Sequence, residues 1–194
     1  MRGHRIVVIG LALALPVAPS IATAQGRPDP AALTAAQREA MSRLNFMDGE
    51  WTGTAWILSP SGEKHNIEQT ERIGPFLDGA VKVIEGRGYG ESGDLEFNAL
   101  AVISYDPAAG QYSMRSYAQG RTGDFVVTPT DDGFQWEIPA GPMTIRYEAV
   151  VKDGTWTEVG DRIVPGQDPI RFIEVTLKRV GDTDWPAAGA IPPQ

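Results

Sequence analysis

A series of turn signals along residues 48–179 constrains the fold more than any other feature of the sequence. Between these signals the chain alternates apolar with polar residues in short runs rich in Val, Ile, Thr, Tyr, Phe and Trp, which is typical of β-strands. The clearest signal is Asp153-Gly154, because a two-residue hairpin turn needs residues that accept a positive φ. Nine breaks of this kind predict about ten antiparallel strands joined as hairpins.

Strands that follow one another through short turns favour an up-and-down barrel, which closes on itself and leaves no exposed sheet edge. A two-sheet sandwich is the alternative, since it also has alternating strands, but the short turns argue against its Greek-key crossings. We therefore predict an all-β domain at residues 45–180, built as an up-and-down antiparallel barrel of about ten strands. The Pro-rich residues 181–194 are expected to form a C-terminal tail.

Residues 1–24 have the order of a cleavable signal peptide. Arg2 and Arg5 precede an uncharged apolar stretch, and Ala22-Thr23-Ala24 places small residues before the expected cleavage site. An uncleaved membrane anchor is the alternative, but it needs about 20 mainly apolar residues, and Pro16 interrupts the stretch well before that length. We expect an exported protein, periplasmic or secreted, with no membrane span after cleavage.

A short helix is expected ahead of the barrel, within residues 25–44. Asp29 suits an N-cap, and Pro30 suits the first helical position. The segment therefore predicts one amphipathic helix across an end of the barrel. Its apolar residues recur at helical spacing at Leu33, Ala36, Ala40 and Leu44.

Composition excludes several classes of function. The chain has no Cys, which removes disulfides, thiolate metal sites and a cysteine nucleophile. Without Arg2 and Arg5 it holds 15 Lys and Arg against 25 Asp and Glu, and the basic residues are scattered, so nucleic acid and anionic membranes are unsuitable partners. The motifs of hydrolases, zinc sites and phosphate-binding loops are missing as well.

Several short motifs carry a resemblance to a known family. Gly49-Glu50-Trp51 opens the first predicted strand, and Ser104-Tyr105-Asp106-Pro107 precedes a turn. Asp153-Gly154-x-Trp156-x-Glu158 follows later, and residues 174–179 form the last predicted strand. In this order the motifs resemble an exported bacterial family of calycin, or lipocalin-like, β-barrels that is classed as a domain of unknown function. The resemblance implies a calycin-like fold and leaves the function open.

The resemblance also implies a structural role for two residues. In lipocalin-like barrels the Trp of the first strand closes the narrow end and packs beside an Arg of a late strand, and Trp51 and Arg179 occupy the matching places here. An indole fills the barrel floor, and a guanidinium stacked on its face donates to loop carbonyls. Trp51 and Arg179 are thus expected to form the floor and to have no catalytic role.

A more distant likeness concerns haem. Gly49-Glu50-Trp51-Thr52-Gly53 is similar to the opening of nitrobindin-like barrels, which hold ferric haem through a histidine near their C-terminal strands. The histidines of this chain are His4, inside the predicted signal peptide, and His65 on the second predicted strand. The ligand position is therefore empty, and we expect neither haem nor another cofactor. His65 alone would also make a poor metal site, so no metal is expected.

Polar residues that share a strand face with apolar residues are candidates for the lining of a ligand-binding barrel. An inward Arg beside a Tyr would bind a carboxylate or phosphate group while the apolar lining holds a hydrocarbon tail. Arg115 and Arg146 have an alternative place on the solvent face, paired with carboxylates of neighbouring strands. The candidate ligand-binding residues are Gln69, Glu71, Arg87, Arg115, Tyr117, Glu158 and Glu174.

The function expected from this pattern is the binding of a small hydrophobic or amphipathic ligand, with or without a carboxylate group. Two alternatives stay open. One is an enzyme of isomerase or lyase type that uses an interior cluster of Glu, Arg and Tyr, although no catalytic residue is assigned. The other is a barrel with a filled core that acts as a structural or interaction module. The oligomeric state is also left open.

Overall fold

The hairpin pattern of the sequence becomes ten antiparallel strands in a computed structural model of the protein. The structure describes residues 29–189 and 191–194, so the predicted signal peptide at residues 1–24 lies outside the described residues. The elements are α1 (Pro30–Ser42), the 3-10 helix η1 (Asn45–Met47), β1 (Gly49–Leu58), β2 (Lys64–Phe76), β3 (Val81–Tyr89), β4 (Leu95–Asp106), β5 (Gln111–Ala118), β6 (Arg121–Pro129), β7 (Gly133–Ala140), β8 (Met143–Lys152), β9 (Thr155–Ile163) and β10 (Ile170–Gly181).

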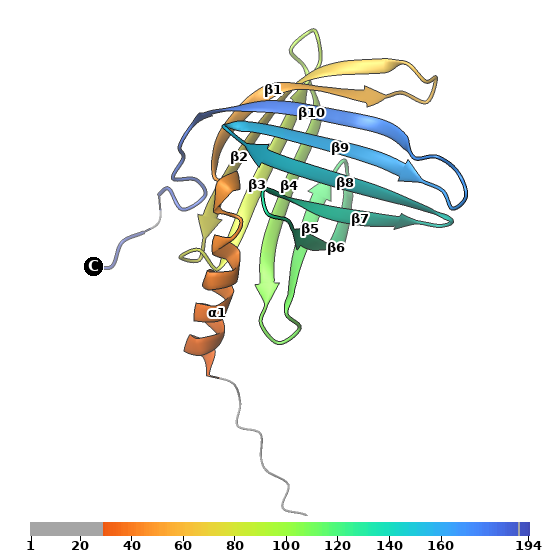
Figure 1. The fold of residues 1–194 in the computed structure, drawn as a ribbon. Helices are drawn as coiled ribbons and strands as arrows, with labels where there is room; N and C mark the ends of the chain where they lie inside the picture. Colours follow the sequence, from red (N-terminus) through yellow and green to blue (C-terminus); the bar gives the residue numbers. More distant parts are fainter. Residues whose placement is uncertain (1–28, 190) are drawn as a thin grey trace, which may run out of the picture.

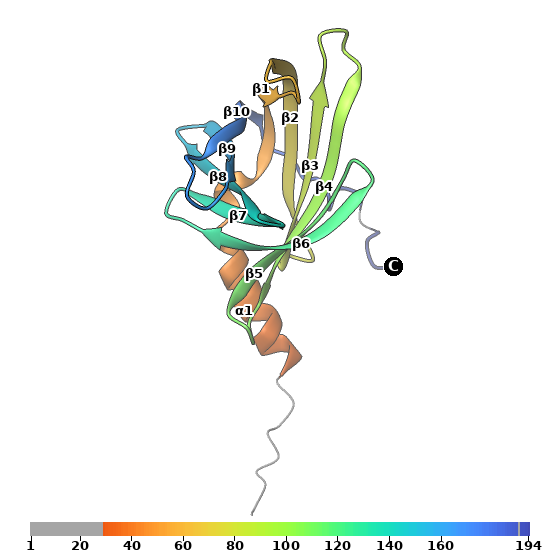
Figure 2. The same ribbon diagram turned by 90° about the vertical axis from the view of Figure 1, so that its right-hand side faces the viewer.

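The ten strands close into one barrel. Each strand pairs with its neighbours in the chain, and β1 also pairs with β10, from Glu50 opposite Gly181 to Ile57 opposite Ile173. Figures 1 and 2 show the strands wrapping around a common interior. The predicted all-β, up-and-down antiparallel barrel with one α-helix is confirmed over the described residues. A two-sheet sandwich is excluded, because it would leave β1 and β10 unpaired.

Helix α1 lies at one end of the barrel, opposite the turns that join β1 to β2 and β3 to β4 (Figure 2). The Asp29 side chain caps it by accepting from the backbone N–H of Ala31 at 3.0 Å. Two contacts join it to the barrel: the Tyr112 hydroxyl donates to the carbonyl of Ala40 at 2.8 Å, and the Gln37 amide donates to the carbonyl of Tyr105 at 3.0 Å. The helix thus covers the end of the barrel at which β1 begins.

The interior next to α1, which we call the floor, is packed with apolar side chains. Trp51 is 2% exposed, lies edge-on to Trp156 with 5.7 Å between ring centroids, and donates its indole N–H to the carbonyl of Met47 at 2.8 Å. The aromatic pair therefore fills the barrel where η1 closes it. The other buried inward residues of the floor are Ile73, Ile103, Met114, Val127, Phe134, Ala149 and Leu177.

Arg179 lies at the same end, directly opposite Trp51 in the β1–β10 pairing. Its guanidinium donates through Nε and Nη2 to the carbonyl oxygen of Asp48, at 3.2 and 3.0 Å, and forms an ion pair with Asp182. A Cβ added to Gly49 would lie 2.7 Å from Nη2, so glycine leaves room for the guanidinium. Arg179 therefore ties β10 to the residues that precede β1.

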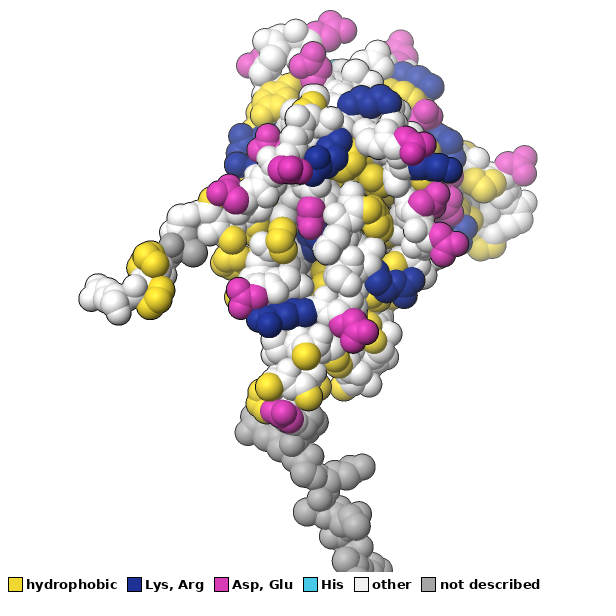
Figure 3. Space-filling model, turned by 60° about the vertical axis from the view of Figure 1, so that its left-hand side comes forward, with side chains coloured by type: hydrophobic (Ala, Val, Ile, Leu, Met, Phe, Trp, Pro, Cys, Tyr) yellow, Lys and Arg dark blue, Asp and Glu magenta, His cyan; other side chains and the backbone are white. Residues whose placement is uncertain are grey.

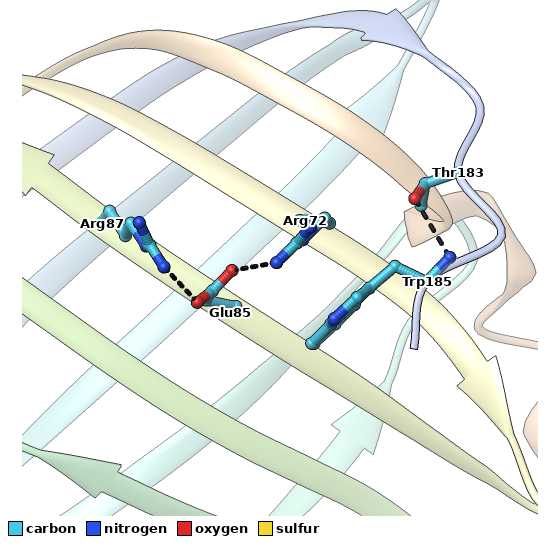
Figure 4. Close-up of polar contacts among 5 residues, drawn as sticks. All are labelled: Arg72, Glu85, Arg87, Thr183 and Trp185. Atoms are coloured by element: carbon cyan, nitrogen blue, oxygen red, sulfur yellow. Dashed lines mark hydrogen bonds and ion pairs between the residues drawn. The ribbon is translucent and has the colours of Figure 1, made fainter. Parts of the chain in front are cut away.

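The C-terminal tail packs on the outer face of β2 and β3. The indole of Trp185 lies over Arg72, 4.6 Å from Cζ to the ring centroid, and Arg72 donates to Glu85 at 2.7 Å (Figure 4). Arg87 donates to the other oxygen of Glu85, also at 2.7 Å. A Cβ added to Gly74 would lie 1.8 Å from the carbonyl oxygen of Trp185, so the tail backbone lies directly against β2.

The surface carries mixed charge. On the face drawn in Figure 3, Lys and Arg side chains are interspersed with Asp and Glu and do not gather into a patch. Among residues 29–189 and 191–194, no helix is both long and apolar enough to cross a membrane.

Candidate functional site

Above the floor, inward-facing side chains keep part of their surface exposed to solvent. Register places all of them except Phe172 on the same face as the floor residues of their own strands, and Phe172 lies at a bulge of β10 with its ring against Tyr147. None of them is fully buried. Solvent therefore reaches the interior of the barrel on the side away from α1. We call this set the chamber, and its members are Glu71, Ala99, Ser116, Ala118, Phe125, Trp136, Tyr147, Glu158, Phe172 and Val175.

One wall of the chamber is built from small residues. Gly86 pairs with Ala99, and Ala99 pairs with Ala118, so three neighbouring strands place little side-chain volume inside. A Cβ added to Gly86 would lie 2.6 Å from the carboxylate of Glu71, which shows that this carboxylate lies across the glycine. The small residues of this wall therefore make room for the Glu71 side chain inside the barrel.

The facing wall is aromatic. Trp136 and Tyr147 stack with 4.2 Å between ring centroids and only 4° between ring planes. Phe125 packs against Trp136 at 5.0 Å, and Phe172 meets Tyr147 edge-on at 5.9 Å. This wall lines the chamber with four aromatic side chains that pack against one another.

A hollow of about 350 Å³ opens at the end of the barrel away from α1. We call it the mouth hollow; among its lining residues are Ile57, Ile67 and Phe97 from the strands and His65 and Glu96 at the rim. His65 Nε2 lies 2.5 Å from Glu96 Oε2, so the rim is joined across the end of β3. Because Ile67 and Phe97 also contact the position of Gly88, the hollow lies next to the polar residues of β2.

Gln69 and Glu71 are polar residues of β2 that face the barrel interior, between Ile67 and Ile73. The side chain of Gln69, 5% exposed as a residue, donates through Nε2 to Glu71 Oε1 at 2.7 Å. Burial raises the pKa of Glu71 to about 8, the hydrogen bond from Gln69 opposes that rise, and the charges of Glu158 and Glu85 add to it. Glu71 thus holds its proton at neutral pH.

Glu158 reaches the same interior from β9. The indole N–H of Trp156 donates to its Oε2 at 3.2 Å. Burial raises the pKa of Glu158 to about 7, against the lowering effect of the Trp156 and Trp136 indoles. Burial, followed by the charge of Glu158, raises the pKa of Tyr147 to about 12, which keeps its hydroxyl protonated.

Neither of these two carboxyl groups forms an ion pair with a described Lys, Arg or His side chain. Of the ion pairs between described residues, none includes Glu71 or Glu158. Arg162 faces inward nearer the mouth, but its guanidinium lies over the ring of Phe172 at 4.9 Å. The buried Lys82 of the floor pairs with Asp48 instead.

Three of the seven candidate ligand-binding residues share this interior: Gln69, Glu71 and Glu158. The other four lie on the outer face, where they do not line a cavity. Arg115 donates to Tyr117 and pairs with Asp124, while Glu174 has the opposite orientation to the inward Val175. Arg87 pairs with Glu85 outside the barrel.

The expectation of an inward Arg87 is corrected by the composition of β3. Its inward positions are Lys82, Ile84, Gly86 and Gly88, two of which are glycines. The outward positions include Val83, which is buried, and its partner Gly74 contacts the tail. Because the C-terminal tail covers part of the outer face of β2 and β3, that face carries apolar residues and resembles an interior face in the sequence pattern.

The sequence pattern missed several inward polar groups, among them Tyr147 and Arg162. Tyr147 alternates with the outward Arg146 and Glu148 on β8, so its parity was the available signal. Arg162 lies on the same face of β9 as Trp156 and Glu158, and this alternation could have indicated its inward position. Within the described ranges, no group of three or more His, Asp or Glu side chains is arranged to hold a metal ion.

Comparison with known proteins supports the fold. No protein-family model and no curated protein matches the chain. A solved structure, described as the crystal structure of Rv2717c from M. tuberculosis, matches with a TM-score of 0.56. It is 11% identical, and the match covers 73% of this chain and 97% of that chain. At this identity the likeness shows a shared fold alone.

Proposed function

We propose that this protein is a calycin-like barrel that binds a small hydrophobic or amphipathic molecule in the chamber, entering through the mouth hollow. The proposal includes export to the periplasm or the medium, which rests on the signal-peptide pattern of residues 1–24. Ligand pockets of this kind are concave, mainly apolar and furnished with a few convergent polar groups. The chamber combines aromatic side chains with Glu71 and Glu158, and the buried Gln69 donates to Glu71.

The proposal rests on a difference between two parts of the barrel interior, one fully buried and one partly exposed to solvent. Ile103 of the floor is completely buried, whereas Ala99 on the same strand and Ala118 on the next strand face inward and remain partly exposed. A barrel that served only as a filled module would pack its whole interior to the density of a protein core. The open part is therefore better explained as space for a ligand.

The experiment is a titration with N-phenylnaphthylamine, whose fluorescence rises in apolar surroundings. The native protein should enhance the fluorescence in a saturable way. Ala99→Trp should abolish most of the enhancement, because an indole at this inward position fills the chamber. Leu100→Trp is the matched control: it adds the same side chain one residue along β4, on the outer face. Equal binding by both variants would contradict the proposal.

A second function, proton transfer on the bound molecule, is favoured by one observation. Glu71 and Glu158 have pKa values of about 8 and about 7, so they exchange protons near neutrality inside an enclosed space. For an isomerase or lyase, incubation with carbon acids in heavy water should give deuterium incorporation that Glu158→Gln abolishes. Incorporation that persists in Glu158→Gln and in Glu71→Gln would exclude this function.

A further inference from the structure

We infer that the ligand of the chamber is a small organic amine, bound as its ammonium form, with an aromatic or aliphatic body. The inference rests on the proposed function, since it names the chemical class that the same interior would select. It depends on which acceptors and which charges face the chamber.

The acceptors come from three side chains. Glu71 and Glu158 each present carboxyl oxygens, and the two groups are near enough for the charge of Glu158 to act on Glu71. Gln69 adds a carbonyl: its Nε2 donates to Glu71, and its Oε1 is the remaining acceptor of this amide. This Oε1 lies 3.2 Å from where a Cβ of Gly88 would be, beside Ile67 and Phe97 of the mouth hollow.

An ammonium group matches this set. It carries three donors and no acceptor, so it suits an interior whose polar groups are carboxyl oxygens and the Gln69 amide oxygen. It would also supply the positive charge that no ion pair in the described part of the chain gives to Glu71 or Glu158. Binding should therefore release protons from the pair, since a nearby cation stabilises the carboxylate form.

The aromatic wall suits the rest of such a molecule. The stacked Trp136 and Tyr147 and the neighbouring Phe125 offer apolar aromatic surface to the body of such a molecule. An anionic ligand is disfavoured, because its charge would face Glu71 and Glu158. The basic residues expected to receive a carboxylate, Arg87 and Arg115, lie outside the barrel. The inward Arg162 is engaged with the ring of Phe172, 4.9 Å from its Cζ to the ring centroid.

The test compares three probes with the same body and different polar ends: phenethylamine, phenethyl alcohol and hydrocinnamate. Each displaces N-phenylnaphthylamine from the native protein near neutral pH. The amine should bind about tenfold more tightly than the alcohol, because it replaces a neutral hydrogen bond with a charge-assisted one. Hydrocinnamate should bind most weakly.

Variants assign the preference to the carboxyl pair. Glu71→Gln and Glu158→Gln should each reduce the affinity for the amine by about tenfold and leave the alcohol almost unchanged. Glu137→Gln is the control, since Glu137 pairs with Arg146 on the outer face. Proton release on amine binding, measured in buffers of different ionisation enthalpy, should disappear in the Glu71→Gln, Glu158→Gln double variant.

The outcomes separate the two proposals. Binding of all three probes with equal affinity, or a preference for hydrocinnamate, would overturn the amine inference and leave the ligand-binding function intact. An amine preference that survives the double variant would also overturn it. No fluorescence enhancement by N-phenylnaphthylamine, with no probe changing the melting temperature, would contradict both.

Discussion

Glu71 on β2 and Glu158 on β9 project into one barrel interior, where burial first, and the charge of Glu158 in addition, raises the pKa of Glu71 to about 8. Two carboxyl groups in a partly enclosed aromatic chamber lower the stability of the protein whenever they ionise without a partner. Ionisation of this pair therefore lowers the free energy of unfolding of the protein when no ligand is bound. A ligand that supplies donors or positive charge would remove that cost, which links the stability of the barrel to its function.

The first prediction concerns the pH dependence of stability. Between the ordinary pKa of 4.5 and about 8, the unfolded chain has released the Glu71 proton while the folded chain retains it. The unfolded state then binds fewer protons, so the free energy of unfolding falls as the pH rises through this window. Glu71→Gln should remove this fall, which amounts to at most about 5 kcal/mol across the window, measured by urea unfolding at a series of pH values. An unchanged slope would contradict the burial of this carboxyl group.

The second prediction concerns the ion pair between Lys82 and Asp48. The Lys82 side chain is 2% exposed and that of Asp48 is 27% exposed, so only the carboxylate reaches water. Asp48→Asn should cost about 3 kcal/mol, because it leaves a buried ammonium without its partner. Lys82→Met should cost clearly less, since the thioether fills the space and Asp48 remains hydrated. Urea unfolding of both variants tests the order, and a larger loss in Lys82→Met would contradict it.

The third prediction concerns the seam between β1 and β10. A Cβ added to Gly53 would lie 2.1 Å from the carbonyl oxygen of Thr176, which is backbone and unable to rotate away. Gly53→Ala should therefore destabilise the protein by about 2 kcal/mol or more. Gly181→Ala is the control, because nothing lies within 4 Å of its added Cβ. Equal melting temperatures for the two variants would show that the seam is looser than the structure indicates.

The fourth prediction concerns the tail. Trp185→Ala removes the ring that covers Arg72 and should lower stability by about 1 kcal/mol while exposing the residues after β10 to protease. Ile191→Ala is the control, since Ile191 is 94% exposed. Limited proteolysis followed by mass spectrometry gives the measurement. Identical cleavage rates for both variants and the native protein would mean that Trp185 does not hold the tail on the barrel.

Sequence reasoning predicted the barrel because hairpin turns and alternation are local properties. Asp153 and Gly154 both adopt positive φ at the turn between β8 and β9, as the dipeptide requires. The hairpin turns depend on neighbouring residues, so one sequence is enough to predict them. Closure was inferred from the short turns between successive strands, and the pairing of β1 with β10 confirms it.

The candidate site was only partly predictable, because parity shows which residues share a face and leaves open which face is inside. Gln69 and Glu71 alternate with Ile67 and Ile73, whose burial inside the barrel follows the usual rule. On β5 the inward Ser116 and Ala118 are small. The sequence pattern therefore could not show that Arg115 and Tyr117 face outward. Small residues face the interior in this part of the barrel, so the strand lacks the large apolar residues that usually identify an inward face.

Native mass spectrometry of the protein purified from its own host tests ligand binding in the chamber most directly. The native chain should carry a small molecule that dissociates on activation in the gas phase. Ala99→Trp, purified in the same way, should lack that molecule, while Leu100→Trp should retain it. A native protein without any bound molecule, or an Ala99→Trp variant that retains it in equal amount, would contradict the assignment of the chamber as a ligand site.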